Sequence, residues 1–185
     1  GAVESGAHQV ALTCAAFGFM FTLGISSAAA VRVGQAVGAG RSEDVRRSGL
    51  AAGILATIVM VGFATMFLTI PKPLARLLTD QPDVLELAAS LFVYAASFAI
   101  FDGIQVAMAG ALRGAGDIRV PFYMTTACYW LFGIPVGLYL GFWAEHGVHG
   151  LWTGLVSGLV LASVLLSARF HWIAKRPIER VEAGA

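Results

Sequence analysis

The strongest constraint in this sequence is a set of five long apolar runs that carry almost no charge. Roughly 20 apolar residues at 1.5 Å per residue cross a hydrocarbon core of about 30 Å, and each run is long enough to do so. The links between the runs are short and charged, which leaves no room for an independent soluble domain. The runs predict transmembrane helices at approximately residues 7–31, 45–70, 83–112, 120–143 and 148–172. We therefore expect an all-α, polytopic membrane fold.

The composition excludes several classes of function. Charged residues make up 12% of the chain, against about 25% in soluble domains, and the net charge is +1 with the basic residues scattered, so a nucleic-acid partner is not expected. The chain contains no P-loop, complete dinucleotide fingerprint, GxSxG or HExxH pattern. Cys14 and Cys128 lie alone inside apolar runs and indicate neither a disulfide nor a zinc site. We expect no enzyme activity, no cofactor and no structural metal.

The lysines and arginines predict the orientation in the membrane. One side of the expected helices carries Arg32, Arg41, Arg46, Arg47, Arg113, Arg119, Arg169, Lys175, Arg176 and Arg180, and the other side carries only Lys72 and Arg76. Because basic residues accumulate on the cytoplasmic side, the C-terminus is predicted to be cytoplasmic and the N-terminus external. Trp143 and Trp152 near the outer side, with Trp172 near the inner side, are interpreted as an interfacial aromatic belt.

The five apolar runs themselves cover residues 5–31, 48–71, 87–112, 120–144 and 146–168. Asp102 is the one charged residue inside them, about 3 to 5 Å from mid-depth. A mid-helix aspartate costs about 2.5 to 3.5 kcal/mol to insert, so it is normally retained where it faces a cavity or a partner. Such a carboxyl can exchange a proton for a metal ion or respond to a cationic substrate. The alternative is a protonated carboxyl that only hydrogen-bonds a neighbouring helix.

Other polar and aromatic residues are candidates for the same cavity. Gln105 lies three residues after Asp102 and Phe98 four residues before it, on the same helix face. Tyr129 lies in the middle of the fourth run and offers stacking or cation–π contact, and Gln9 lies at the outer start of the first. Interhelical hydrogen bonding or packing remains an equal alternative for these residues.

Two backbone features complete the expected architecture. Small residues recur at a spacing of four in the third run, a pattern that lets a second helix approach closely: Ala95, Ala99, Gly103, Ala107 and Ala111. Pro135, between Gly133 and Gly137 in the fourth run, removes a backbone hydrogen bond and is predicted to kink that helix and act as a hinge.

Taken in order, several short motifs resemble the second half of a MATE (multidrug and toxic compound extrusion) transporter of the bacterial type. They are AHQVAL at 7–12, VRVGQAVGAG at 31–40, FDGIQVAMAGALRGAGD at 101–117, GIPVG at 133–137 and GLWTG at 150–154. The resemblance implies that residues 1–185 are part of the C-lobe of a twelve-helix, inner-membrane protein whose N-terminal lobe lies outside this chain. Gly1 in place of Met and the predicted external N-terminus lead to the same expectation of missing upstream helices.

The resemblance also implies a function and a site. MATE proteins exchange Na⁺ or H⁺ for small organic, often cationic, compounds across the lipid bilayer. Asp102 matches the acidic position of the tenth helix that contributes to a cation site in bacterial members, so Na⁺ or H⁺ is expected there. Some members have a tyrosine where Phe98 stands, and the acidic partner on the seventh helix falls outside this sequence.

Two other functions fit the same composition. A flippase for lipid-linked sugars has a related architecture, although such proteins usually hold phosphate with basic cavity residues and none of the five runs contains lysine or arginine. A non-transporting membrane subunit is the second alternative, and the buried position of Asp102 argues against it.

Overall fold

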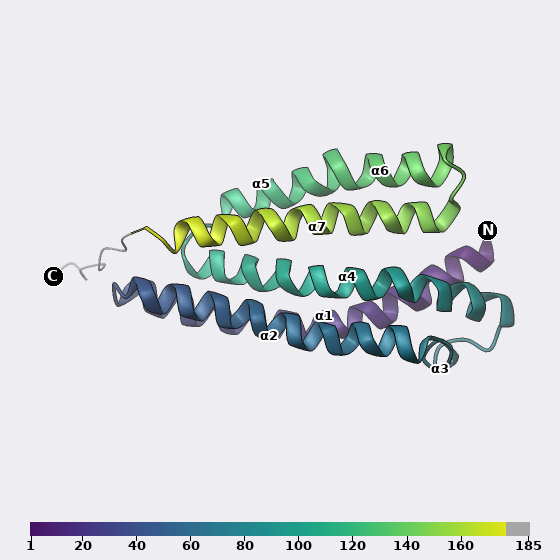
Figure 1. Ribbon diagram of the computed structural model, residues 1–185, viewed down its shortest axis with the longest axis horizontal. Helices are drawn as coiled ribbons and strands as arrows, with labels where there is room; N and C mark the ends of the chain where they lie inside the picture. The colour runs from purple at the N-terminus through teal and green to yellow at the C-terminus, as the bar shows by residue number, and fades with distance from the viewer. Residues whose placement is uncertain (177–185) are drawn as a thin grey trace.

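The computed structural model describes residues 1–176, which form a bundle of long antiparallel helices (Figure 1). Five helices are long and apolar enough to cross a membrane: α1 (Ala2–Gly38), α2 (Ser42–Thr69), α4 (Pro82–Gly114), a fourth span from Arg119 to Trp143, and α7 (Gly147–Ile173). The short helix α3 (Pro71–Arg76) lies between α2 and α4. Residues 1–176 contain no β-strand, so the prediction of an all-α membrane fold is confirmed.

The helices extend beyond the charge-free runs from which they were predicted. Helix α1 begins at Ala2 and continues to Gly38, whereas the sequence predicted a helix over 7–31. Charged residues such as Glu4 and Arg32 mark the edge of the apolar segment, but a helix satisfies its own backbone hydrogen bonds and continues past them. Charge therefore marks the end of the apolar segment and not the end of the helix.

Helix α4 is the centre of the bundle. It packs against α1 and α2 on one side and against α7 on the other, and the fourth span packs mainly on α7. In Figure 1 these segments form successive layers, with the fourth span outermost and α1 and α2 on the opposite side. Residues on α4 that face α7 or α1 are consequently the most enclosed positions that this chain provides.

Small side chains allow α4 to sit this deeply. Ala95, Ala99, Ala107 and Ala111 are all buried. At Gly103, an added Cβ atom would lie 2.6 Å from Cγ of Met60 on α2. The predicted small-residue stripe is thus a packing face, and it holds α4 in a fixed rotation that directs Asp102 away from α2.

The fourth span is helical throughout but irregular. It consists of α5 (Arg119–Ala127), the π-helix η1 (Cys128–Gly133), α6 (Ile134–Leu138) and the π-helix η2 (Tyr139–Trp143). Pro135 is exposed near the start of α6, between the two π-helical segments. Proline and π-turns both interrupt regular i to i−4 hydrogen bonding, so this span has weaker internal bonding than its neighbours.

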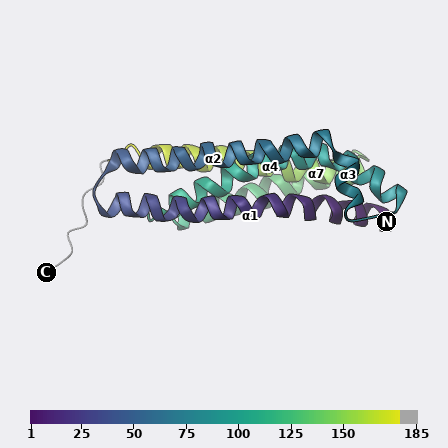
Figure 2. The ribbon, with the colours of Figure 1, turned by 90° about the horizontal axis from the view of Figure 1, so that it is seen from below.

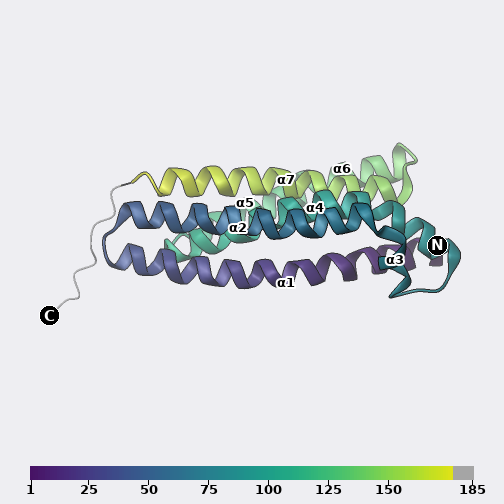
Figure 3. The same cartoon turned by 60° about the horizontal axis from the view of Figure 1, so that its bottom comes forward.

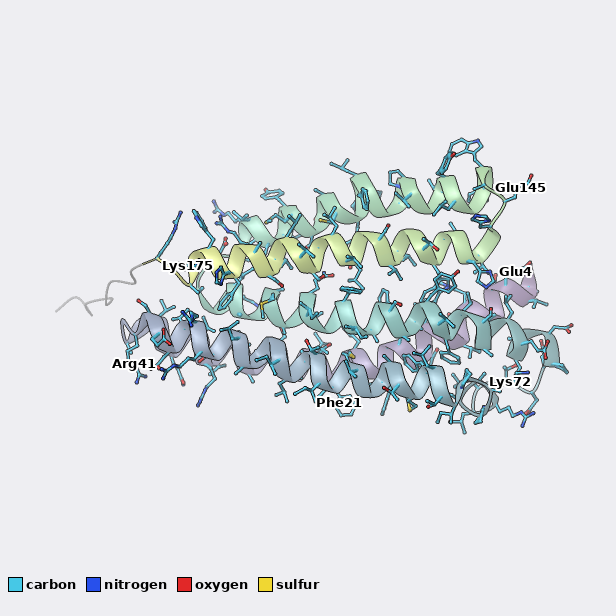
Figure 4. All side chains as sticks on the ribbon, viewed as in Figure 1. Glu4, Phe21, Arg41, Lys72, Glu145 and Lys175 are labelled. Atoms are coloured by element: carbon cyan, nitrogen blue, oxygen red, sulfur yellow. The ribbon has the colours of Figure 1, made fainter. Side chains whose placement is uncertain are left out.

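The two ends of the bundle differ in charge (Figure 4). One end, called the basic end, carries the α1–α2 link with Arg41 and the end of α7 with Lys175. The other, called the acidic end, carries Glu4, Lys72 and Glu145. Trp143 is 77% exposed and Trp172 is 47% exposed, at opposite ends, as the aromatic-belt interpretation predicted. Arg180, which the orientation argument also used, lies outside the described residues.

Candidate functional site

Asp102 is held by α4 in the interior of the bundle, with 7% of its surface exposed. It lies twelve residues before the end of α4 at Gly114, roughly 18 Å from the basic end. Among residues 1–176, no hydrogen bond or ion pair reaches its carboxyl group. The same residues contain no group of three or more His, Cys, Asp and Glu side chains that could hold a metal ion. Asp102 is therefore a largely buried carboxyl that has no bonded partner among residues 1–176 and is free to bind a ligand.

Gln105 and Tyr129 form a polar contact one turn from Asp102. The Tyr129 hydroxyl donates a hydrogen bond to Oε1 of Gln105 at 2.9 Å and so joins η1 to α4. The sequence left open whether Gln105 faces a cavity or bonds another helix, and the structure assigns it the interhelical bond.

Gly158 on α7 leaves room for Tyr129 to reach Gln105 on α4. An added Cβ atom at Gly158 would lie 3.0 Å from Cα of Gly133 and 3.4 Å from Cδ1 of Tyr129. Because position 158 has no side chain, η1 lies directly against α7 and the Tyr129 ring passes it to reach α4. The π-helical turns begin at this point, a feature that is frequent at functional sites.

An aromatic group lies next to Asp102 on the side of the acidic end. Trp152 of α7 is fully buried, with its ring centroid 6.2 Å from Phe98 and 5.7 Å from His8, both in edge-to-face geometry. The interpretation of Trp152 as an interfacial belt residue is wrong. Its place near the outer end of the fifth apolar run suggested the membrane–water interface, but the side chain packs between α1, α4 and α7.

Trp152 also carries an unusual polar atom. Its indole Nε1 is the one completely enclosed side-chain nitrogen or oxygen in the described part of the chain that has no hydrogen-bond partner. A groove of about 390 Å³, lined in part by His8 and Trp152, opens at the acidic end beside it. An unpaired buried donor beside a groove can bind a ligand or water without losing an existing bond.

His149 of α7 lies nearer the acidic end than Trp152 and also contacts α4. It lies in the first turn of α7, which begins at Gly147, and so within the helix predicted over 148–172. Its ring nitrogen Nε2 lies 3.0 Å from Oγ of Ser90, and its ring centroid lies 5.6 Å from that of Tyr94. Gly147 has φ +55°, a conformation that glycine adopts without strain and that permits the helix to start this early.

These contacts define one row of side chains along α4, which we call the α4 column: Ser90, Tyr94, Phe98, Asp102 and Gln105. A spacing of four, then three, keeps them on one helix face, and they meet His149, Trp152 and Tyr129 from the other side. From Ser90 to Asp102 the column is roughly 18 Å long and leads toward the middle of the bundle. Sequence analysis missed Ser90, Tyr94, His149 and Trp152, although the four-residue spacing back from Asp102 was a usable signal for two of them.

Gln9 does not join the α4 column. It is exposed on α1, where its backbone carbonyl accepts a hydrogen bond from the Thr13 hydroxyl. It also lines a separate groove of about 370 Å³ next to Thr79. Its neighbour His8 is the residue that faces Trp152. The rotation of 100° per residue in an α-helix places consecutive side chains on different faces.

The α4 column combines one carboxylate with amide, hydroxyl and aromatic groups. Carboxylate and carbonyl oxygens suit hard cations, and aromatic faces attract organic cations. No lysine or arginine of the described residues takes part in its contacts. The column is therefore suited to positively charged ligands.

The comparisons with known proteins agree on one family. The MatE family model matches residues 1–139. The chain is 39% identical over 176 residues to the probable multidrug resistance protein NorM of Xanthomonas axonopodis pv. citri, covering 95% of this chain and 38% of that protein. It is 40% identical over 176 residues to the multidrug resistance protein NorM of Burkholderia vietnamiensis, covering 92% of this chain and 38% of that protein.

Solved structures agree on the fold. The eukaryotic MATE transporter AtDTX14 superposes with a TM-score of 0.87 at 24% identity, over 96% of this chain and 41% of that one. An inward-facing multidrug resistance MATE family transporter superposes with a TM-score of 0.76 at 16% identity, over 94% of this chain and 43% of that one. The chain thus spans about two fifths of the length of the proteins it matches. With a family model that covers residues 1–139, the chain belongs to the MatE family of multi-pass membrane transporters, which are not enzymes.

Proposed function

We propose that this chain is part of the C-lobe of a secondary transporter that exports small organic, often cationic, drugs by antiport with Na⁺ or H⁺. The observation that carries the proposal is Asp102, a buried carboxyl without a polar bond from the described residues, next to aromatic and amide groups on one helix face. A buried carboxylate without a protein cation is costly, so a bound proton, Na⁺ or organic cation stabilises it.

The coupling step follows from competition at Asp102. A proton or Na⁺ and a cationic drug each neutralise the carboxylate, and binding of one lowers the affinity for the other. If the two lobes adopt inward-open and outward-open arrangements with different affinities for these ligands, each ligand shifts the populations of the two states. Gln105 and Tyr129 would then offer an amide and a phenol to the ligand near Asp102, and Phe98 would contact the drug through its ring face.

The proposed topology has the basic end in the cytoplasm of a bacterium and the protein in the inner membrane. The basic end carries most of the lysines and arginines, among them Arg41 and Lys175, whereas α3 at the other end carries Lys72 and Arg76. This asymmetry supports the orientation through the positive-inside rule. The C-terminus is then cytoplasmic. The five spans correspond to helices eight to twelve of twelve, and the missing lobe supplies the other wall of the cavity.

Pro135 is proposed as the hinge of the fourth span. The π-helical segments on both sides of α6 have irregular backbone hydrogen bonding, so bending there breaks fewer regular bonds than elsewhere. Tyr129 lies on this span and bonds Gln105 of α4, so a bend at Pro135 would move the phenol relative to Gln105.

The test of the proposed function is efflux of a fluorescent cationic dye from cells that express the full-length protein. We expect Asp102→Asn to abolish ion-dependent efflux at unchanged membrane level. Asp83→Asn is the matched control, because Asp83 is exposed in the first turn of the same helix. If the full-length wild type exports no dye, drug export is refuted; if Asp102→Asn exports as wild type does, coupling belongs to another residue.

A further inference from the structure

We propose that a groove between α1 and α2 at the basic end binds an anionic phospholipid, with the phosphate on arginines and an acyl chain along the apolar part. The groove has a volume of about 710 Å³. It is lined by α1, α2 and the link between them, and it takes no residue from the α4 column. Binding sites for small ligands have volumes of roughly 300 to 1,000 Å³, so this groove is large enough for a headgroup and part of a chain.

The mouth of the groove is strongly basic. Arg32, Arg41 and Arg47 all line it, against a single carboxylate, Asp44. Among residues 1–176, Arg32 has no recorded ion pair or hydrogen bond. Arginine presents a planar fork of donors that matches two phosphate oxygens at once, which favours a phosphate ligand over a neutral headgroup.

The ion pairs that do form at the mouth do not neutralise it. Arg41 pairs with Asp44 at 3.1 Å, and Arg47 pairs with Glu43 at 3.1 Å. The arginine side chains are 64% and 73% exposed, and ion pairs this exposed contribute little to stability. A phosphate that contacts Arg32 and Arg47 therefore displaces only weak interactions.

The groove becomes apolar in the direction of the membrane. On α1 its lining extends from Arg32 to Gly24, and on α2 from Arg47 to Leu55, eight residues or about 12 Å in each case. Small side chains, including Ala28, leave the groove open along this length. Charge at one end and 12 Å of apolar wall beyond it fit a phospholipid, whereas free phosphate would use only the mouth.

The position of the groove suits a lipid of the cytoplasmic leaflet. Figures 2 and 3 show α1 and α2 side by side along the bundle, and the groove between them is lined without α4. Basic pockets between transmembrane helices on the cytoplasmic side bind anionic headgroups. Covering three guanidinium groups with an apolar helix from elsewhere in the protein would bury unpaired charge, which argues against a polypeptide occupant.

The test is native mass spectrometry of the purified full-length protein after delipidation and titration with phosphatidylglycerol or phosphatidylcholine. We expect the double variant Arg32→Gln, Arg47→Gln to bind phosphatidylglycerol about 30-fold more weakly than wild type, because each arginine near an anionic group contributes about fivefold. Phosphatidylcholine binding should stay unchanged. Arg46→Gln is the matched control, since Arg46 is adjacent to Arg47 but lines a different groove.

Two further arms identify the occupant. Inorganic phosphate at millimolar concentration should not displace phosphatidylglycerol, and Ala51→Trp, which fills the apolar part, should reduce its retention. Equal phosphatidylglycerol binding by wild type and the double glutamine variant would overturn the proposal, as would displacement by phosphate or no binding by wild type. If Ala51→Trp fails to fold, the double variant decides. Binding is measured without transport, so the result is independent of drug export.

Discussion

Gly110 provides a direct test of how α4 is held at the centre of the bundle. An alanine Cβ atom at this position would collide with the backbone carbonyl oxygen and the hydroxyl of Ser26 on α1. Backbone atoms cannot rotate away, so α1 and α4 would have to separate by on the order of 1 Å, and overpacking of this kind costs about 1 to 3 kcal/mol. Gly110→Ala should therefore destabilise the protein.

Gly62 is the matched control, since a Cβ atom added there meets nothing within 4 Å. Both substitutions replace a helical glycine and gain about the same helix propensity, roughly 1 kcal/mol, so their difference isolates the steric cost. In SDS-induced unfolding of the full-length protein, we expect Gly110→Ala to have a free energy of unfolding about 1 to 3 kcal/mol below that of Gly62→Ala. Equal values would refute the close backbone contact between α1 and α4.

Three further predictions concern individual contacts. Tyr129→Phe removes the 2.9 Å bond to Gln105 and should lower the free energy of unfolding in the same assay by about 0.6 kcal/mol, the average for interhelical hydrogen bonds in membranes; a gain in stability would contradict the bond. A protein that retains Trp152 as its only tryptophan should fluoresce at shorter wavelength than one that retains only Trp143, because Trp152 is fully buried and Trp143 is 77% exposed; coincident emission maxima would contradict this burial. The Asp117 carboxylate lies 2.8 Å from Nε of Arg169 with side chains 14% and 25% exposed, so a double-mutant cycle should give a coupling of about 1 kcal/mol or more, and additive effects would count against the ion pair.

The spans and the central carboxyl were predictable because they depend on composition along the chain. A charge-free run of more than 20 residues has few alternatives to a membrane helix, and the cost of Asp102 inside such a run does not depend on knowledge of its neighbours. The small-residue face of α4 was also predictable, because helical periodicity alone brings Ala95, Ala99 and Gly103 to one side.

The residues that pack against the α4 column were less predictable, because they depend on which helix faces which. Trp152 and His149 lie near the end of an apolar run, a position that suggests the membrane interface or a loop. The burial of Trp152 and the contact of His149 with Ser90 follow from the packing of α7 against α4, which local sequence does not encode. Gln9 illustrates the same limit, since the adjacent His8 faces the bundle in its place.

The most direct test of the proposed coupling at Asp102 is ion movement driven by drug in proteoliposomes that contain the full-length protein. With an imposed gradient of a cationic drug and no ion gradient, we expect wild type to move Na⁺ or H⁺ in the opposite direction. Asp102→Asn should fold and insert into the proteoliposomes normally but move neither ion, while Asp83→Asn should behave as wild type. Drug-driven ion movement by Asp102→Asn at the wild-type rate would contradict the assignment of coupling to this carboxylate.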